Sequence, residues 1–594
     1  MQSFLWVFIF LIIFSFSNLS LQAAVLPPAC SSVDRAALLG FKARILKDTT
    51  GILSSWTTRD CCDGNWVGIQ CNSATGRVTQ MQLQGPSDKD SGLYMKGTLS
   101  PTLGNLQFLE VLIITGMKRI SGSIPESFAN LNRLTQLVLE DNQIHGTIPA
   151  SLGHLALLKA ISLNGNHLTG QIPGSFGNIR NLVQLTLARN TLSGPVPSTF
   201  RNLHNLQYLD LSYNSLSGSI PGLVGQFKNL TFLDLSNNKF TGKIPSSLGS
   251  LNNLLDLSLS HNQLSGIIPV QIGDIKSLTS LSLSVNQLTG QIPESISRFQ
   301  SLWYLNLSRN ALSNPLPGAF AKGIPSLLSI DLSYNKLSLG KVPEWITGRE
   351  LSDVHLAGCN LVGTLPSFKN PNSITSIDLS DNHFNRGISN FFAKMSSLQN
   401  VKISNNQLKS DLSMITLPRG LSSLDLHSNL FSGHLSKILN NSTSRFLQFV
   451  DLSNNQISGS IPELLEGSNL ILLNISRNKI TGNVPNSISN LIKLQRLDIS
   501  RNQVRGTIPT SLGSLLKLQW LDLSMNRLIG RIPESLLNIE RLKHANFKAN
   551  RLCGLIPQGR PFNIFPAVAY GHNLCLCGKP LPPCKGKKNK EMSQ

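Results

Sequence analysis

An asparagine recurs at nearly constant spacing through most of this 594-residue chain. It closes the pattern LxxLxLxxN, first seen in full at Leu134, Leu137, Leu139 and Asn142. The equivalent position, which we call the ladder position, is then filled by Asn166, Asn190, Asn214, Asn238, Asn262, Asn286, Asn310, Asn335, Cys359, Asn382, Asn406, Asn429, Asn455, Asn478, Asn502, Asn526 and Asn550. Of the 17 intervals, 12 are 24 residues long and the rest fall between 23 and 26. Such a period predicts a solenoid of stacked units and leaves no reasonable non-repeat alternative.

Each unit is predicted to contain one short strand. The alternating leucines point inward and the residues between them point outward, so stacked units bury a continuous core beneath a parallel sheet. Residues seven, six, four, two and one positions before the ladder position are therefore expected to face outward. At the ladder position the backbone turns inward while still buried, and an asparagine side chain supplies the donors and the acceptor that the backbone needs.

The second half of each unit predicts a tight turn and a short return. Glycine follows four residues after the ladder position and proline follows three residues later, as in Gly146 and Pro149. Glycine permits a turn with positive φ, and proline ends strand pairing on that side. The following segment, for example 150–155, predicts a short helical or 3₁₀ turn on the convex side. Two degenerate units, around 83–101 and 109–125, bring the total to about twenty.

Eight of the nine cysteines flank the repeats. They are Cys30, Cys61, Cys62 and Cys71 before the repeats, and Cys553, Cys575, Cys577 and Cys584 after them. This placement indicates two local disulfides at each end and an oxidising compartment. Metal ligation by the last three cysteines of either group is the alternative, but neither group has a zinc-type CxxC pair, so no metal is expected. The ninth, Cys359, occupies a ladder position and is interpreted as a buried structural thiol rather than a nucleophile.

The N-terminal end predicts export. Residues 4–16 are apolar and are followed by Ala23 and Ala24, which is typical of a secretory signal peptide. No Lys or Arg precedes the apolar run, so a retained N-terminal anchor is the alternative. No later stretch reaches the ~18 uninterrupted apolar residues of a membrane helix, and no transmembrane anchor is expected.

The chain carries a formal net charge of +21, to which a lysine-rich tail contributes. A solvated basic surface and an acidic partner are both compatible with this charge. Export argues against a nucleic-acid partner.

The motif LxxLxLxxNxLxGxIP resembles the plant-type extracellular leucine-rich repeat and covers nearly the whole chain after residue 75. Residues 34–42, 53–56, 60–62 and 66–71 resemble that superfamily's N-terminal cap, and residues 552–584 are especially similar to polygalacturonase-inhibiting proteins. The resemblance implies an α/β leucine-rich-repeat solenoid, curved, with a parallel β-sheet on the concave face and short 3₁₀ or helical turns on the convex face. It also implies disulfide-bonded caps at both ends. The implied pairs are Cys30–Cys61, Cys62–Cys71, Cys553–Cys575 and Cys577–Cys584.

The expected domains follow from the repeat limits and the two caps. They are a signal peptide (1–24), an N-terminal cap (25–75), about twenty repeats of ~24 residues (76–552), a C-terminal cap (553–584) and a basic tail (585–594). Polygalacturonase-inhibiting proteins have about half as many repeats, so their contact positions do not transfer here. Plant receptor-like proteins match the length better, but they continue into an acidic stretch and a membrane helix, neither of which this chain has.

Departures from the unit consensus at outward positions predict a binding surface on the concave face. Exposed aromatics and arginines are the usual anchors of protein interfaces, aromatic faces stack on sugar rings, and arginine pairs with carboxylates. The candidates are Tyr208, Tyr213, Phe232, Trp303, Tyr304, Arg309, Tyr334, Arg477, Arg496, Arg501 and Trp520. Surface variation is the alternative for any single residue, and the clustering is what supports a site.

Two further sets of residues bear on that surface. An aspartate recurs four residues before the ladder position and is interpreted first as scaffold and second as an acidic stripe: Asp210, Asp234, Asp331, Asp378, Asp425, Asp451, Asp498 and Asp522. Sequons predict glycosylation at Asn229, Asn306, Asn440, Asn441 and Asn474. Because Asn306 and Asn474 share the outward row, a glycan would obstruct neighbouring strands. A contact patch at 303–309 therefore requires an unmodified Asn306.

No catalytic set is recognisable. His145, His261, His355 and His544 are scattered singly, no glycine-rich phosphate loop occurs, and a curved groove offers no closed cavity. We therefore expect no enzyme activity and no cofactor. The leading hypothesis is a secreted recognition protein of the extracellular space or cell wall, which binds a microbial wall-degrading enzyme in plant defence. The alternatives are a soluble receptor-like protein or co-receptor that binds a ligand with a receptor kinase ectodomain, and a structural protein that docks on acidic pectin.

Overall fold

The computed structural model describes residues 28–86, 92–439 and 445–584. The expected signal peptide and basic tail lie outside the described residues, as do Asn440 and Asn441. The chain forms two compact units: residues 1–143 make up unit 1 and residues 144–594 make up unit 2.

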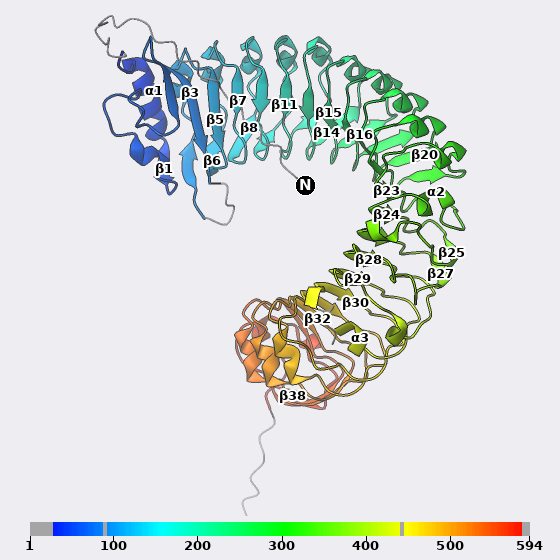
Figure 1. Ribbon diagram of the computed structural model, residues 1–594. Helices are drawn as coiled ribbons and strands as arrows, with labels where there is room; N and C mark the ends of the chain where they lie inside the picture. Colours follow the sequence, from blue (N-terminus) through cyan, green and yellow to red (C-terminus); the bar gives the residue numbers. More distant parts are fainter. Residues whose placement is uncertain (1–27, 87–91, 440–444, 585–594) are drawn as a thin grey trace, which may run out of the picture. The chain divides into compact units, whose positions relative to one another are not determined.

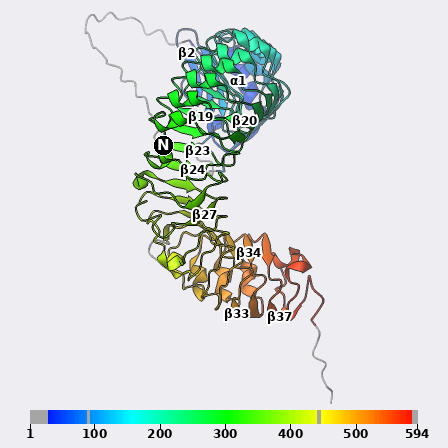
Figure 2. The ribbon, with the colours of Figure 1, turned by 90° about the vertical axis from the view of Figure 1, so that its right-hand side faces the viewer.

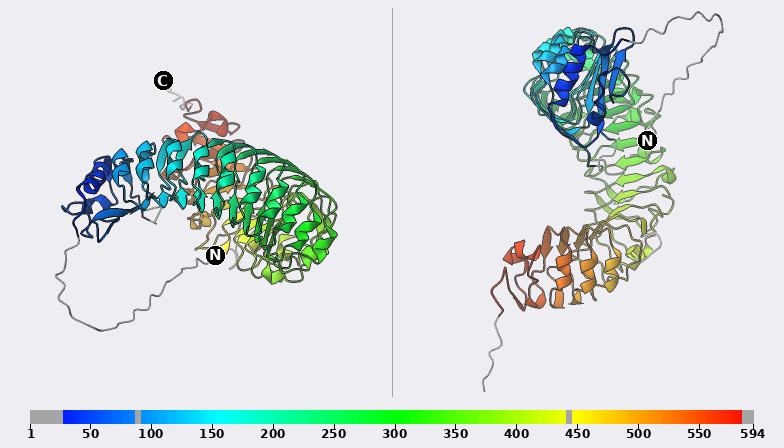
Figure 3. Two further views of the ribbon diagram at one scale, coloured as in Figure 1. Left: turned by 90° about the horizontal axis from the view of Figure 1, so that it is seen from above. Right: turned by 90° about the vertical axis from the view of Figure 1, so that its left-hand side faces the viewer.

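Unit 1 holds the N-terminal cap and the two degenerate repeats. Helix α1 (Ser32–Lys42) buries Leu38 and Phe41 and lies beside the strands of this unit (Figure 3). One sheet comprises β2 (Ile69–Asn72), β3 (Arg77–Gln84), β5 (Val111–Thr115) and β7 (Gln136–Val138), of which β2 and β3 are antiparallel and the rest parallel. The other comprises β1 (Ile45–Asp48), β4 (Met95–Thr98) and β6 (Lys118–Gly122). The 3₁₀ helices are η1 (Ile52–Ser55), η2 (Pro101–Asn105) and η3 (Glu126–Asn130).

The N-terminal cap is closed by the disulfides Cys30–Cys61 and Cys62–Cys71, the same pairs that the resemblance implies. Beneath them the Trp56 and Trp66 rings stack with centroids 5.1 Å apart. The buried Asp34 carboxylate on α1 accepts hydrogen bonds from the Arg77 guanidinium at 2.8 Å and from the Val78 N–H at 2.9 Å. A buried carboxylate is tolerated only when charged and polar partners surround it, as here. These hydrogen bonds also join α1 to β3.

Unit 2 is built on one long sheet, which we call the main sheet, in which consecutive repeats pair in parallel. Each strand contributes about three residues, of which the middle one is buried. In order, the strands are β9 (Ala160–Ser162), β11 (Gln184–Thr186), β13 (Tyr208–Asp210), β15 (Phe232–Asp234), β17 (Asp256–Ser258), β19 (Ser280–Ser282), β21 (Tyr304–Asn306), β23 (Ser329–Asp331), β24 (Asp353–His355), β26 (Ser376–Asp378), β28 (Asn400–Lys402), β29 (Ser423–Asp425), β30 (Phe449–Asp451), β31 (Leu472–Asn474), β32 (Arg496–Asp498), β34 (Trp520–Asp522) and β36 (His544–Asn546).

Shorter parallel sheets follow the ladder position on another side of the same repeats, as β33 and β37 show relative to β34 in Figure 2. Their strands are β8 (Gln143–Thr147), β10 (His167–Thr169), β12 (Ser193–Gly194), β14 (Ser215–Ser219), β16 (Lys239–Gly242), β18 (Gln263–Gly266), β20 (Gln287–Gln291), β22 (Ala311–Ser313), β25 (Val362–Thr364), β27 (His383–Arg386), β33 (Arg505–Thr507), β35 (Arg527–Gly530), β37 (Arg551–Leu555) and β38 (Cys575–Cys577).

The return segments are mostly single 3₁₀ turns that begin after the consensus proline, as predicted, and within unit 2 they line the outer side of the curved stack (Figure 1). They are η4 (Ala150–His154), η5 (Gly174–Asn178), η6 (Ser198–Asn202), η7 (Gly222–Gln226), η8 (Ser246–Ser250), η9 (Val270–Asp274), η10 (Glu294–Arg298), η11 (Gly318–Ala321), η12 (Pro371–Ser373), η13 (Leu412–Met414), η15 (Asn486–Asn490), η16 (Thr510–Ser514), η17 (Glu534–Asn538), η18 (Phe562–Ile564) and η19 (Ala567–Ala569). Two short helices, α2 (Glu344–Thr347) and α3 (Ser436–Leu439), replace this turn in their repeats.

The ladder asparagines act as the sequence predicts. The buried Asn238 amide donates to the carbonyls of Leu211 (2.9 Å), Leu235 (3.2 Å) and Ser236 (3.1 Å). Its Oδ1 accepts the N–H of Leu216 in the preceding repeat at 2.9 Å. One side chain thus provides hydrogen-bond partners for backbone groups of two successive repeats, at a point where the strands' own hydrogen bonds do not reach them.

Cys359 takes the same place with fewer hydrogen bonds. Its Sγ lies 3.6 Å from the Leu332 carbonyl and 3.7 Å from the Ala357 carbonyl, and it is fully buried. Burial raises the pKa of the thiol to about 12, so the reactive thiolate is disfavoured. This agrees with a structural role for the ninth cysteine.

The last disulfides close the C-terminal cap as Cys553–Cys575 and Cys577–Cys584, again the pairs that the resemblance implies. Among the described residues, no helix combines the length and the apolar character that crossing a membrane requires.

Candidate functional site

The outward face of the main sheet is assembled from rows of equivalent residues. In β13 the side chains of Tyr208 and Asp210 flank the buried Leu209 and point to the opposite side of the sheet from it. Parallel pairing keeps the repeats in register, so Tyr208 lies beside Phe232 and Asp210 beside Asp234. A residue type that departs from the consensus in neighbouring repeats therefore forms a cluster on this face.

The residue just before the ladder position adopts a left-handed backbone conformation. Tyr213 has a φ of 51°, Arg309 and Arg477 of 53°, Tyr334 of 55° and Arg501 of 53°. This conformation costs a non-glycine residue about 1–2 kcal/mol. It turns the chain from the strand into the buried ladder and leaves this residue's own side chain at the edge of the main sheet.

One predicted outward row is wrong. In most repeats the residue two positions before the ladder position is buried; Ser212 and Ser236, for example, are each 4% exposed. The chain bends there beneath the aspartate, so that Asp210 Oδ1 accepts from the Ser212 N–H at 3.0 Å and from its Oγ at 2.7 Å. Four rows, rather than five, make the surface.

The recurring aspartates are scaffold, as first interpreted. In each of the eight, Oδ1 accepts the backbone N–H of the residue two positions later at 2.8–3.2 Å. Burial raises the pKa of Asp234 and Asp498 above the ordinary value, in opposition to these hydrogen bonds. The row carries partly exposed carboxylates, but its recurrence is explained by the turn that it caps.

The first cluster of candidate residues, the N-terminal patch, lies on β13 and β15. The Tyr208 and Phe232 rings stack with centroids 4.2 Å apart and planes 2° from parallel. Burial, and then Asp210, Asp234 and Asp256, raise the pKa of Tyr208 to about 12, so the phenol stays protonated as a hydrogen-bond donor. Tyr213, in the same repeat, is 57% exposed at the sheet edge.

The second cluster, the middle patch, combines four of the predicted residues. Trp303 is 47% exposed and its ring lies 5.7 Å from that of Tyr304. The Arg309 guanidinium sits 4.4 Å over the Tyr334 ring. Tyr334 in turn donates from its hydroxyl to Asp381 at 2.6 Å, so the Arg309–Tyr334 pair is held in place before any partner arrives.

The third cluster, the C-terminal patch, is a stack across β32, β34 and β36. The Arg496 guanidinium lies 4.6 Å from the Trp520 ring, which stacks 3.6 Å from the imidazole of His544. Arg496 Nε, Trp520 Nε1 and His544 Nε2 are buried without hydrogen-bond partners among the described residues. Burial lowers the pKa of His544. Arg477 and Arg501 are exposed at the sheet edge and take no part in this stack.

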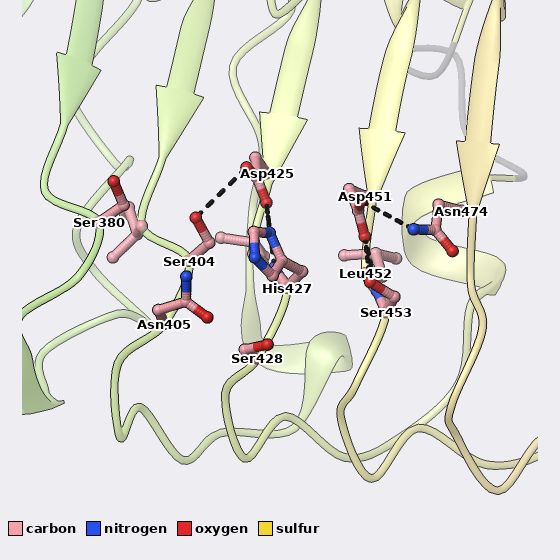
Figure 4. Close-up of polar contacts among 12 residues, drawn as sticks. Ser380, Ser404, Asn405, Asp425, His427, Ser428, Asp451, Leu452, Ser453 and Asn474 are labelled. Atoms are coloured by element: carbon pink, nitrogen blue, oxygen red, sulfur yellow. Dashed lines mark hydrogen bonds and ion pairs between the residues drawn. The ribbon is translucent and has the colours of Figure 1, made fainter.

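Two histidines at or beside this surface were not among the predicted binding residues. His544 was one of the scattered histidines, although its spacing of 24 residues from Trp520 and of 48 from Arg496 places the three in one row. His427 replaces the serine two positions before the ladder position. Its Nδ1 lies 2.6 Å from Asp425 Oδ1 in a pair that Ser404 also contacts (Figure 4). The hydrogen bond to Asp425 raises the pKa of His427. In both cases, the departure from the repeat consensus was the sequence signal that could have identified the histidine.

The described sequons differ in their environment. Asn306 takes the aspartate role, accepting from the Ser308 N–H at 3.0 Å and donating to the Tyr304 hydroxyl at 3.1 Å. Asn474 does likewise and donates to Asp451 at 2.8 Å (Figure 4). Asn229 lies away from the strands, exposed, and donates to the His204 carbonyl at 3.1 Å. The side chains of Asn306 and Asn474 are thus engaged in hydrogen bonds on the outward face of the main sheet.

Within the described residues, the cluster with metal-ligand geometry is Cys30, Cys61 and Cys62. Their sulfurs are consumed by disulfides and are not available as thiolate ligands.

Comparison with family models identifies leucine-rich repeats at both ends and in the middle of the chain. Residues 31–72 match the leucine rich repeat N-terminal domain and residues 197–381 match a leucine-rich repeat region. Single leucine-rich repeats match at 133–155, 157–179, 181–203, 446–468, 469–491, 493–515 and 517–539.

Curated relatives match short stretches of the chain. The polygalacturonase inhibitor of Vitis vinifera is 37% identical over 111 residues, which is 18% of this chain and 30% of that protein. The DNA damage-repair/toleration protein DRT100 of Arabidopsis thaliana is 35% identical over 122 residues, 19% of this chain and 32% of that protein. Receptor-like protein EIX2 of Solanum lycopersicum is 34% identical over 118 residues, 19% of this chain and 11% of that protein. The matched stretches thus span less than a third of these relatives.

Solved structures match over most of the length of this chain. The ectodomain of the Arabidopsis thaliana receptor kinase GASSHO1/SCHENGEN3 is 32% identical with a TM-score of 0.72, over 88% of this chain and 65% of that one. The Arabidopsis HAESA ectodomain is 30% identical with a TM-score of 0.58, over 93% of this chain and 99% of that one. Together with the ladder, the paired caps and the matched repeat models, these similarities show that the chain belongs to the plant-type extracellular leucine-rich-repeat proteins.

Proposed function

We propose that the main sheet of unit 2 is a recognition surface for an extracellular protein and that the chain performs no catalysis. The observation that carries this is the ordering of three clusters of aromatic and arginine side chains on one face, the N-terminal, middle and C-terminal patches. Aromatic rings, and arginines that are already stacked on them, lose little entropy on binding, and both residue types are the usual interface anchors. Among the described residues of this face, we identify no nucleophile, base and oxyanion donors that converge on one cavity.

The leading partner is a microbial wall-degrading enzyme, in a defence role at the cell wall. The similarity to the Vitis vinifera polygalacturonase inhibitor supports this choice. Adding the purified protein to an endopolygalacturonase should lower its activity, and Trp303→Ala with Tyr304→Ala should restore most of it. Unchanged activity at a large excess of folded protein would remove the inhibitor role.

The alternative partner is a receptor kinase ectodomain, which would bind a ligand jointly with this chain. The match to HAESA, solved in complex with a peptide hormone, supports it. The role predicts ligand-dependent co-elution of the two ectodomains in size-exclusion chromatography. Association that is independent of ligand would count against a co-receptor.

A basic face supports docking on acidic pectin as a second activity. Arg505 and Arg527 are cross-strand neighbours on β33 and β35, Arg531 directly follows β35 in the same repeat, and Arg551 begins β37 in the next repeat; all four are exposed. The protein should be retained on immobilised polygalacturonate and released by high salt, because charges are screened beyond ~10 Å at 0.1 M. Arg505→Glu with Arg527→Glu should elute at clearly lower salt.

We propose secretion with removal of residues 1–24, division at 25–75, 76–552 and 553–584, and glycosylation at the exposed Asn229. The disulfide caps support an oxidising destination. For protein collected from the medium, N-terminal sequencing tests the removal of residues 1–24, and glycopeptide mass spectrometry tests the glycosylation of Asn229. A mature chain that retains residue 1 would overturn the first.

A further inference from the structure

A groove separates the last strand of the main sheet, β36, from the C-terminal cap. Its inner part encloses about 410 Å³ between His544 and Lys548 on one side and Phe565 and Val568 on the other. An outer part of about 710 Å³ continues past Arg541 and Arg560. Lys543 and Ile564 line both parts, so the two form one continuous depression.

The cap side of the groove is rigid. The buried Tyr570 hydroxyl donates to the Phe562 carbonyl at 3.1 Å. The N–H of Phe547 donates to the Ala569 carbonyl at 2.7 Å, which extends the sheet into the cap. The rings of Phe547, Phe562 and Tyr570 pack beneath with centroids 5.8–6.0 Å apart. The shape of the groove is therefore present without a partner.

Two large apolar side chains nevertheless stand exposed on this rigid wall. Ile564 is 63% exposed and Val568 is 62% exposed, although the next residue in the sequence is buried in each case. Both line the inner part of the groove, opposite β36. Adjacent exposed apolar groups over a hollow indicate a binding site rather than scattered surface residues.

The rim of the groove is basic. Arg541, Lys543, Lys548 and Arg560 line its two parts, against one carboxylate, Glu540. The nearest aspartate of the main sheet, Asp522, is already bonded to the Ser524 N–H at 2.9 Å and to the Asn546 amide at 3.1 Å. A partner that enters the groove therefore meets apolar surface inside and excess positive charge at the edge.

His544 links the groove to the C-terminal patch. It lines the inner part while its ring stacks on Trp520, which holds the imidazole in place. Burial lowers its pKa, which favours the neutral ring as a flat floor for an apolar or aromatic group.

We propose that this groove binds an acidic peptide segment carrying one bulky apolar or aromatic side chain. The side chain packs on Ile564, Val568 and the His544 ring, and the flanking carboxylates pair with Lys543, Lys548 and Arg541. The inference rests on the proposed use of the main sheet for protein recognition, and it adds the class of segment that occupies the last repeat and the cap.

The test uses the full mature chain and a fluorescein-labelled peptide, Glu-Asp-Phe-Glu-Asp, in fluorescence anisotropy. We expect saturable binding that weakens at least about tenfold when Phe is replaced by Ser or the acids by Lys, as loss of an anchor predicts. Val568→Asp should weaken binding about tenfold. The matched control is Ile492→Asp, which changes an equally exposed apolar residue after η15 and should leave the affinity unchanged.

Circular dichroism melts of both variants establish that each is folded. Equal binding of the acidic and basic peptides, no saturable binding, or equal effects of the two substitutions would each overturn the groove assignment. Trp303→Ala separates this result from the proposed function. It should leave peptide binding intact while it weakens capture of a folded partner, so either claim can fail without the other.

Discussion

At the scale of single residues, the ladder asparagine carries the most structural consequence. Asn238 replaces backbone pairing for two repeats at once, with donors to Leu211 and Leu235 and an acceptor for Leu216. The aspartate four residues earlier caps the bend before it, as Asp234 does for Ser236 at 2.8 Å. Repetition of these two side chains gives the sheet its register and leaves its outward residues free to vary.

Replacing Asn238 by Ala should open the turn between two repeats. It leaves a buried N–H and buried carbonyls without partners, which costs about 1–3 kcal/mol. The opening free energy of the Leu216 amide, measured by hydrogen exchange, should fall by about 2 kcal/mol. Asn252→Ala, at an exposed position of the return segment, is the matched control. Equal protection in the two variants would show that the ladder does not hold the turn.

His427 makes stability depend on pH in a defined direction. Its pKa is raised above the ordinary 6.5, chiefly by the hydrogen bond to Asp425, against desolvation. A raised folded pKa means that the contribution is fully present below 6.5 and is lost as pH rises through the folded pKa. The stability difference between the wild type and His427→Ser, followed by urea melts, should therefore shrink as pH rises across this window. A difference that grows with pH would contradict the assigned pair.

At the scale of elements, spacing alone predicted much of what the structure holds. The period fixed the strands, the glycine turns, the 3₁₀ returns and the row in which each candidate side chain lies. It could not predict that Ser212 is buried, because that depends on a backbone bend capped by Asp210. Nor could it predict that the Arg496, Trp520 and His544 side chains stack, because rotamers depend on the packing of neighbouring strands.

The stack on β32, β34 and β36 makes a testable claim about Trp520. Its ring covers the imidazole of His544, and burial lowers the pKa of that group. Trp520→Ala should readmit water and raise the His544 pKa toward its ordinary value, as followed by NMR of the imidazole protons. Trp303→Ala, just before β21 and far along the main sheet, should leave that pKa unchanged. A His544 pKa that does not move in Trp520→Ala would show that the ring does not shield it.

At the scale of the whole molecule, the stacked repeats form a scaffold that holds variable side chains on the outward face of the main sheet. Neighbouring repeats share a continuous core and are joined by the hydrogen bonds of the ladder asparagines. The disulfides Cys30–Cys61, Cys62–Cys71, Cys553–Cys575 and Cys577–Cys584 close the two ends. Because stability is nearly a sum over neighbouring repeats, outward residues of one repeat change at little cost to the others. We therefore expect the binding residues to lie at departures from the consensus.

The most direct test places an obstacle on the main sheet without disturbing its fold. Ser282→Asn creates a sequon in β19, beside Asn306 in the next strand, at a position where natural repeats already carry asparagine. The glycosylated variant should lose inhibition of an endopolygalacturonase, and enzymatic removal of the glycan should restore it. Full inhibition by the glycosylated variant would contradict the claim that this face of the sheet meets the partner.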